Sequence, residues 1–441
     1  MIDILFVMFF TFIPVLTILI LKITGFSVFK VGLVQFTTLS LFVFSFFGTL
    51  PLFFGWDEYR FNTGVNDKEL VFQIMLMSGW TMLVVVLGAI FAKKVLGQIK
   101  GVEAGNIKQK NVELILVFFL FFLVCVVLML YLSKLSSIAL FAVLEFGSSA
   151  AGVSRSVMGN DFSGKYHWYK VFIYDFANIV TYVTFYYYLT YRNKLNTFLF
   201  LASLCLSVFT AIMATEKGPI VWLLIGMFVT YTLAKNDGAY PVRKLIPFVI
   251  MVMATLIVSY IYFMGSLDVL SALTSVFSRT FAGSIEPVYY YLQYIPQHHD
   301  WLYGQSFPNP GNLLPHTPFL LPKEIMSGVH PELTAQGIVG SMPAVFWAEM
   351  YANFSWVGVL ITPFFVGFLL YSVECVFSFM PATPLKVGVY VWVLLHYKNL
   401  ANSGLFGFIF DFYLIIIVFV YITIILVNEI LVVCTRKTYF E

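Results

Sequence analysis

Residues 112–132 read VELILVFFLFFLVCVVLMLYL, and Glu113 is the one charged residue in this stretch. An α-helix needs about 20 consecutive apolar residues to cross a bilayer, so the stretch predicts a membrane-spanning helix. The whole chain of 441 residues has the same character, with 60% hydrophobic residues, 11% charged residues and a mean hydropathy of +0.91. Soluble domains carry about 25% charged residues. The composition therefore predicts an all-α, polytopic integral membrane protein.

Similar apolar runs follow one another along the chain, and about eleven of them predict transmembrane helices. They lie near 2–21, 29–54, 70–91, 112–132, 169–190, 196–214, 219–234, 245–264, 344–378, 387–397 and 405–433. The run at 387–397 is short, and the run at 344–378 is long enough to include a turn. Because the runs are continuous rather than alternating, a β-barrel is not favoured. We treat residues 1–441 as a single membrane domain.

The connections between these runs differ in their content of lysine and arginine. If the spans alternate in direction, the short basic connections fall on one side, which the positive-inside rule makes cytoplasmic. That side carries Lys22, Lys30, Lys93, Lys94, Lys100, Lys108, Lys110, Arg192, Lys194, Lys235, Arg243, Lys244, Lys386, Arg436 and Lys437. Two large loops, 133–168 and 266–343, then fall on the outer side. Within the first, residues 137–146 are too few to span and are expected to lie at the membrane surface.

Several classes of function lack support in the sequence. The net charge of +3 comes with no basic stripe suited to nucleic acid, so no nucleic-acid partner is expected. The four cysteines show no metal-ligand spacing, and the adjacent His298 and His299 would point apart on a helix, so no metal site is predicted. A Walker loop, a G-x-S-x-G elbow and an H-E-x-x-H motif are missing. We therefore expect no cofactor, no ATP-driven transport and no hydrolytic nucleophile.

The outer segments contain cations that suit an anion held at the lipid surface. They include Arg155, Lys165, Lys217, Arg279, Lys323 and Lys398. Arginines are disfavoured in outer connections, yet Arg155 and Arg279 lie in the two longest ones. Each belongs to a Ser-Arg-x-x-x-Gly pattern, at 154–159 and 278–283. Lys217 lies in a very tight turn between two spans. The alternatives are coincidence for the pattern and helix-end snorkelling for the lysines.

Candidate bases lie at the far end of the second outer loop. Glu349 begins a span, where a carboxylate is costly unless it is paired or reaches a water-filled cavity. Such a group suits a general base, and the alternative is a structural carboxylate satisfied by a neighbouring arginine. His330 is a second candidate base. Glu286 and Glu332 are loop residues that we expect to be solvated.

Aromatic residues cluster in the same loop. They include Tyr289, Tyr290, Tyr291, Tyr294, Trp301 and Tyr303. Tyrosine and tryptophan in outer loops anchor a protein at the membrane interface. They also stack on the apolar faces of sugar rings. Both interpretations remain open at this point.

The motifs around this loop resemble those of a known family. The loop carries Gly304-Gln305-Ser306-Phe307, several prolines and a Gly/Ser stretch at 337–341, and the chain re-enters the membrane with Ala348-Glu349-Met350-Tyr351-Ala352-Asn353-Phe354. This arrangement resembles the oligosaccharide repeat-unit polymerases, or O-antigen polymerases (Wzy). The turn at 215–218 is similar to that family's short basic turn between central spans. Phe162-Ser163-Gly164-Lys165 is similar to its first large loop.

The resemblance implies a fold similar to that of the GT-C glycosyltransferases. It also implies an enzyme of the bacterial inner membrane with a periplasmic active face, which joins undecaprenyl-diphosphate-linked oligosaccharides. Under this mechanism Arg155, Lys217 and Arg279 bind the diphosphate, Arg279 also assists catalysis, Glu349 is the base, and His330 is the reserve base. The residues expected to bind sugar are Lys165, Tyr289, Tyr290, His316, Tyr351, Asn353 and Lys398.

Two other activities remain open. One is a flippase or transporter for the same lipid-linked sugar, although such proteins usually show repeated halves with broken helices, which are not evident here. The other is an O-antigen ligase, which shares the outer face and the donor. Expected partners are the lipid-linked oligosaccharides, membrane lipids, a chain-length regulator and a flippase.

Overall fold

The computed structural model describes residues 1–98, 111–147, 151–159, 162–265, 268–332, 340–409 and 411–437. Within these ranges the regular elements are helices and no strand occurs. Eight of the helices are long and apolar enough to cross a membrane. The prediction of an all-helical, multi-pass membrane protein is therefore confirmed, whereas the count of eleven spans stays a prediction.

Each of the eight candidate spans is a single helix except the second, which consists of three consecutive helical segments. They are α1 (Ile2–Ile23), the run α2 (Leu33–Leu41), η1 (Phe42–Phe46) and α3 (Thr49–Phe53), then α5 (Lys68–Leu96), α6 (Asn111–Leu132), α11 (Lys194–Met213), α12 (Gly218–Lys235), α13 (Val242–Met264) and α18 (Phe346–Phe379). The other three predicted ranges also hold helices. These are α9 (Tyr166–Lys170), η3 (Val171–Phe176) and α10 (Ala177–Thr190) at the first, α19 (Pro384–Tyr397) at the second, and α20 (Phe406–Ile409) and α21 (Phe412–Lys437) at the third.

The chain groups into two compact units. Unit 1 comprises Met1–Gly101, Phe277–Val376 and His396–Asp411, and unit 2 comprises Val102–Val276, Phe377–Leu395 and Phe412–Glu441. Neither unit is continuous in sequence, because the helices after residue 276 divide between them. Each unit therefore brings together side chains that are distant in the sequence.

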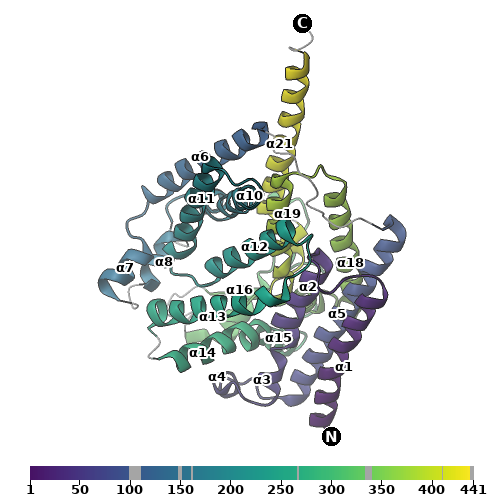
Figure 1. Ribbon diagram of the computed structural model, residues 1–441. Helices are drawn as coiled ribbons and strands as arrows, with labels where there is room; N and C mark the ends of the chain where they lie inside the picture. The colour runs from purple at the N-terminus through teal and green to yellow at the C-terminus, as the bar shows by residue number, and fades with distance from the viewer. Residues whose placement is uncertain are drawn as a thin grey trace. The chain divides into compact units, whose positions relative to one another are not determined.

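In unit 1, α5 lies beside α1 and packs closely on α18 (Figure 1). A Cβ atom on Gly88 would lie 2.0 Å from the carbonyl oxygen of Phe364, and one on Gly367 would lie 1.9 Å from that of Val85. Glycine at both positions thus lets the two backbones touch. Farther along the same pair, the Tyr371 hydroxyl donates to the Gly97 carbonyl at 2.8 Å.

The loops of unit 1 that are predicted to lie on the outer side form short helices. They are α4 (Glu58–Asn62), η4 (Ser278–Ala282), α15 (Gly283–Tyr294), η5 (Pro310–Asn312), α16 (Leu321–Val329) and η6 (Lys398–Ala401). The long helix α18 breaks at Phe354 and Ser355, where Ser355 has a φ of 56°. The length of the run at 344–378 left room for a turn or an interfacial helix, and the break separates a short first piece that carries Glu349 from the rest of the helix.

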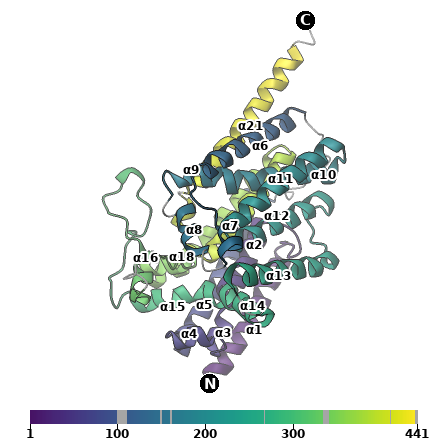
Figure 2. The ribbon, with the colours of Figure 1, turned by 90° about the vertical axis from the view of Figure 1, so that its left-hand side faces the viewer.

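In unit 2, helices α10, α11 and α12 pack together (Figures 1 and 2). The ring of Tyr182 fills the space where a side chain on Gly226 would lie, which brings α10 and α12 close together. The first outer loop adds a helical pair, α7 (Ala139–Phe146) and α8 (Ala151–Met158). Helix α7 has 8 residues and is too short to span, as the sequence predicts.

Candidate functional site

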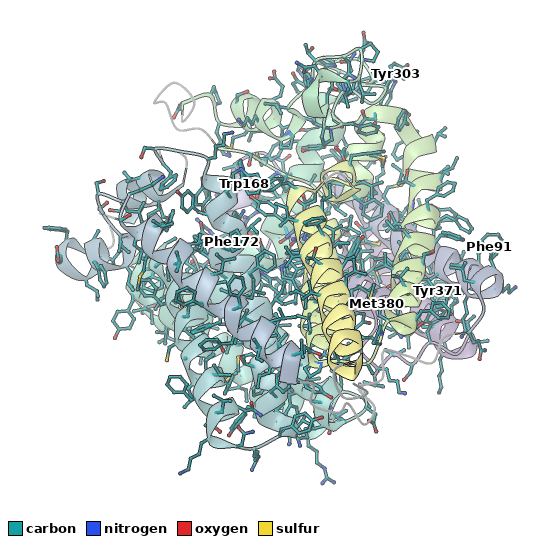
Figure 3. All side chains as sticks on the ribbon, turned by 90° about the horizontal axis from the view of Figure 1, so that it is seen from above. Phe91, Trp168, Phe172, Tyr303, Tyr371 and Met380 are labelled. Carbon is teal, nitrogen blue, oxygen red and sulfur yellow. The ribbon has the colours of Figure 1, made fainter. Side chains whose placement is uncertain are left out.

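A cavity of about 650 Å³ lies in unit 2, where the end of the first outer loop meets the start of α21. Its walls are Gly159, Phe162, Gly164, Lys165, Tyr166, His167, Trp168, Phe412 and Tyr413. Figure 3 shows Trp168 on the same stretch of chain as Phe172, the stretch formed by α9 and η3. Ligand pockets in proteins measure about 300–1,000 Å³ and are lined mainly by apolar and aromatic groups, so this cavity has the size and lining of a binding site.

The aromatic walls are fixed by contacts with one another. Trp168 and Phe412 meet edge to face, with ring centroids 4.8 Å apart. The Nδ1 atom of His167 lies 2.9 Å from the Tyr413 hydroxyl. Lys170 places its ammonium group 5.2 Å from the centre of the Tyr413 ring. Because these rings are held before any ligand arrives, little order would be lost on binding.

The cavity is basic as well as aromatic. Lys165 is exposed at its edge, and its side chain makes no hydrogen bond or ion pair within the described ranges. Gly159 leaves the backbone accessible, since a Cβ atom there would meet only the Arg155 carbonyl oxygen, at 3.7 Å. No carboxylate lines the cavity among the residues that the structure describes. The lining therefore combines aromatic rings with a lysine ammonium group at the edge of the cavity.

Two of the predicted diphosphate ligands meet at one turn of unit 2. Arg155 Nε donates to Thr215 Oγ1 at 3.0 Å. Thr215 has a φ of 53°, which bends the chain sharply between α11 and α12. Two residues later, the Lys217 ammonium lies 3.8 Å from the centre of the Tyr260 ring. The structure therefore brings Arg155 and Lys217 to the same turn.

The same turn adjoins the cavity wall. Burial raises the pKa of Tyr166 to about 12, and the charge of Glu216 contributes to the shift. Glu216 lies within the turn and Tyr166 lines the cavity. The aromatic cavity and the Arg155–Lys217 turn are thus neighbouring parts of one region of unit 2.

Unit 1 contains a buried arginine, Arg60, that is not among the site residues predicted from the sequence. The Arg60 side chain is buried, and its Nη1 atom donates to Asp57 Oδ2 at 2.6 Å. Its Nε atom donates to Glu286 Oε2 at 2.7 Å. The expectation that Glu286 is solvated is therefore wrong, because α15 carries it against Arg60. By contrast, the predicted Arg279 is exposed on η4, and its side chain makes no hydrogen bond or ion pair within the described ranges.

In the cluster of Arg60, Asp57 and Glu286, burial is the largest single influence on the pKa values of Arg60 and Glu286. Burial raises the pKa of Glu286, and the Arg60 charge opposes that shift without cancelling it. Burial lowers the pKa of Arg60, but the Glu286 and Asp57 charges outweigh it, so the net shift is upward. His330 is close enough for its charge to lower the pKa of Glu286. The reserve base, His330, therefore lies near a half-buried carboxylate.

Glu349, the predicted base, takes part in a network that holds the chain. Its Oε1 accepts from Ser306 Oγ at 3.0 Å, and its Oε2 accepts from the Leu405 amide at 2.7 Å. A Cβ atom on Gly404 would lie 2.6 Å from Oε2. Asn353 is fully buried, and its amide nitrogen donates to Ser306 Oγ and to the Glu349 carbonyl. The carboxylate is thus satisfied by a serine and a helix start rather than by an arginine.

The predicted sugar ligands of unit 1 are mostly built into its interior. Tyr289 and Tyr351 are buried, so neither presents a ring to a sugar. The Tyr290 hydroxyl is half-buried beside the Thr63 carbonyl, 3.5 Å away. His316 lies in a turn of the long loop, with Nε2 3.5 Å from the Phe307 carbonyl. Lys398 is buried and donates to Asn399, and burial lowers its pKa to about 7.

A sequence signal for Arg60 did exist. The disfavour of arginine in outer connections, which singles out Arg155 and Arg279, applies equally to Arg60, because alternation of the spans places the connection 55–68 on the predicted outer side as well. The aromatic cavity had no such signal, because Phe412 and Tyr413 are distant in sequence from the loop that they meet. Part of the predicted Gly/Ser stretch, 337–339, lies outside the described residues.

Within the described ranges, no group of three or more His, Cys, Asp or Glu side chains could hold a metal ion. The candidate features are therefore an aromatic, basic cavity with a neighbouring cationic turn in unit 2 and, separately, hydrogen-bonded carboxylates in unit 1. Compared with protein-family models, curated proteins and solved structures, the chain finds no match.

Proposed function

We propose that this protein is a membrane glycosyltransferase that joins undecaprenyl-diphosphate-linked oligosaccharide units at the outer face of the bacterial inner membrane, with a fold similar to that of GT-C enzymes. The single observation that carries the proposal is the aromatic, basic cavity of unit 2 beside the Arg155–Lys217 turn. A lipid-linked oligosaccharide has the matching parts, namely sugar rings and a diphosphate. Aromatic walls bind the first, and an arginine with a lysine binds the second.

The reaction needs no external energy source. An acceptor hydroxyl attacks the anomeric carbon of the donor, a carbon–oxygen bond forms between the sugars, and the bond from that carbon to the diphosphate oxygen breaks. The hydroxyl proton passes to a base, and undecaprenyl diphosphate leaves with its negative charge. Cations aimed at the departing diphosphate stabilise this charge as it develops. We assign this role to Arg155 and Lys217 of unit 2, and Arg279 of unit 1 remains a proposed diphosphate ligand as the sequence predicts.

The base assignment follows from the hydrogen bonds. Glu349 already accepts from Ser306 and from the Leu405 amide, so we propose that it holds these two segments together. His330 is half-buried and lies near the Glu286 carboxylate. Histidine is the side chain that most often serves as a general base in enzymes. We therefore propose His330 as the base and reserve Glu349 for structure.

Variant proteins in cells test these roles through the length of the polysaccharide ladder. We expect Arg279→Ala and Arg155→Ala to shorten or abolish the ladder, since loss of one charge-stabilising donor costs about 100- to 1,000-fold in rate. His330→Gln should do the same at normal protein levels. Arg192→Ala is the matched control, because Arg192 is exposed and belongs to the basic connections predicted to be cytoplasmic. Full-length ladders from Arg155→Ala, Arg279→Ala and His330→Gln would contradict the proposal.

A further inference from the structure

The exposed Arg279 lies in a short segment, residues 278–286, that one guanidinium holds at both ends. Arg60 Nη1 donates to Ser278 Oγ, immediately before Arg279. Arg60 Nε donates to Glu286 Oε2 at 2.7 Å, farther along the segment. The carboxylate of Asp57 completes the arrangement, since it accepts from both Arg60 and Ser278. Every one of these donors and acceptors belongs to unit 1.

The segment is also seated by two close backbone approaches. A Cβ atom on Gly283 would lie 2.5 Å from Arg60 Nη2, so the guanidinium occupies the space that a side chain would need. A Cβ atom on Gly48 would lie 2.1 Å from the carbonyl oxygen of Phe281, which brings the composite helix α2–η1–α3 against the segment. The turn that carries Arg279 is therefore held both by backbone packing against Gly48 and by the contacts of the Arg60 guanidinium.

The two arginines have opposite surroundings. Arg60 is buried and paired with two carboxylates, so an anionic ligand could reach its charge only by breaking those pairs, which is strongly unfavourable in a buried site. Arg279 is exposed and makes no hydrogen bond or ion pair within the described ranges. Arg60 is thus suited to hold the chain, and Arg279 is suited to bind.

We propose that Arg60 is a positioning residue, which fixes the segment 278–286 through Ser278, Glu286 and Gly283 so that Arg279 is held outward toward the diphosphate of the lipid-linked substrate. The inference rests on the proposed function for what Arg279 binds, but the clamp itself is independent of it. An arginine held in one place loses less freedom on binding than one on a mobile loop, and so binds an anion more tightly. Asp57 is the partner that orients Arg60.

Spin labelling tests the clamp without any assay of activity. Cys125, Cys205, Cys375 and Cys434 are first replaced by alanine, and Arg279→Cys is labelled in proteoliposomes. The line shape at position 279 is then compared for the parent, Arg60→Lys, Arg60→Ala and Gly283→Ala. Lys30→Cys, an exposed position elsewhere in unit 1, is the control label.

The clamp predicts that the label at position 279 becomes more mobile in all three variants while the label at position 30 does not change. Gly283→Ala keeps every polar group of the clamp. It therefore still tests the proposal if the Arg60 variants fail to fold. Equal mobility of the label at position 279 in parent and variants would overturn the proposal. An equal increase in label mobility at positions 279 and 30 would overturn it as well.

Activity measurements separate the clamp from the proposed function. With Arg279 retained, Arg60→Lys should raise the KM for the lipid-linked unit, because a lysine cannot bridge both ends of the segment. An unchanged KM and kcat in a variant with a mobile segment would overturn the positioning role. A full ladder from Arg279→Ala would instead count against the proposed function and leave the spin-label result intact.

Discussion

Lys398 is a residue whose chemistry is changed by its surroundings. It is buried in η6, and burial lowers its pKa to about 7 from an ordinary value of 10.5. Between these two values the unfolded chain carries a proton that the folded protein lacks, so the free energy of unfolding should rise with pH across this window. Below about pH 7 both states are protonated and the penalty of the buried charge is fully present.

Lys398→Met removes this titration. We expect the variant to melt at a higher temperature than the parent at pH 7, and to lose most of the rise in melting temperature between pH 7 and pH 10 that the parent shows. Thermal unfolding in detergent at several pH values provides the measurement. An identical pH dependence in parent and variant would show that the amine is not buried in the folded protein.

Glu349 offers a second prediction at the scale of one residue. Glu349 accepts from both the Ser306 hydroxyl and the Leu405 N–H, and in Glu349→Gln only one oxygen remains for these two donors. A buried N–H left without an acceptor costs about 1–3 kcal/mol. We expect Glu349→Gln to have a lower melting temperature than the parent. The control Glu145→Gln should melt like the parent, because the Glu145 side chain is exposed. If Glu349→Gln melts normally yet loses all polymer ladder, the carboxylate acts in catalysis and our structural assignment is wrong.

At the scale of elements, the contact between α5 and α18 depends on glycine. Gly367→Ala would place a methyl group 1.9 Å from the Val85 carbonyl oxygen, so the two helices must separate. Overpacking of this kind costs about 1–3 kcal/mol or more. We expect a clear loss of thermal stability for Gly367→Ala. Gly328→Ala in α16 is the matched control, because its new Cβ atom would meet nothing within 4 Å. Equal stability of the two variants would contradict this packing.

Hydropathy predicts where the helices lie but not how they are interrupted. A helix occurs at each predicted run because about 20 apolar residues leave the backbone no other way to satisfy its hydrogen bonds in a bilayer. The π-helical turn η4 and the break at Ser355 depend instead on packing against other elements. Arg60 illustrates the difference: the sequence shows an outer arginine, and only the fold shows that Ser278 and Glu286 surround it.

At the scale of the whole molecule, the positive-inside rule predicts the orientation of every loop. We expect single cysteines at positions 165 and 303, in a cysteine-free background, to react with a membrane-impermeant thiol reagent added to intact spheroplasts. Both side chains are exposed, and Tyr303 lies at the edge of unit 1 (Figure 3). Cysteines at positions 30 and 192 should react only after the membrane is opened. The reverse pattern would invert the topology.

The candidate site divides in the same way between what sequence can and cannot predict. Arg155 and Lys217 meet at one turn, and residue type with loop position was enough to select both. Tyr289 and Tyr351 were chosen by the same criteria and are buried, because burial depends on neighbours that composition does not specify. The cavity joins residues 159–168 to Phe412 and Tyr413, and a contact across that separation follows from tertiary packing alone.

The most direct test of glycosyl transfer uses the purified protein in proteoliposomes with undecaprenyl-diphosphate-linked repeat units as the sole substrate. We predict that products of increasing length form without ATP or a metal-dependent partner enzyme, and that the products lose length when Trp168 and Lys165 are both changed to alanine. A protein that only moves the lipid between leaflets, or that transfers glycan only when a second kind of acceptor lipid is added, would contradict the account.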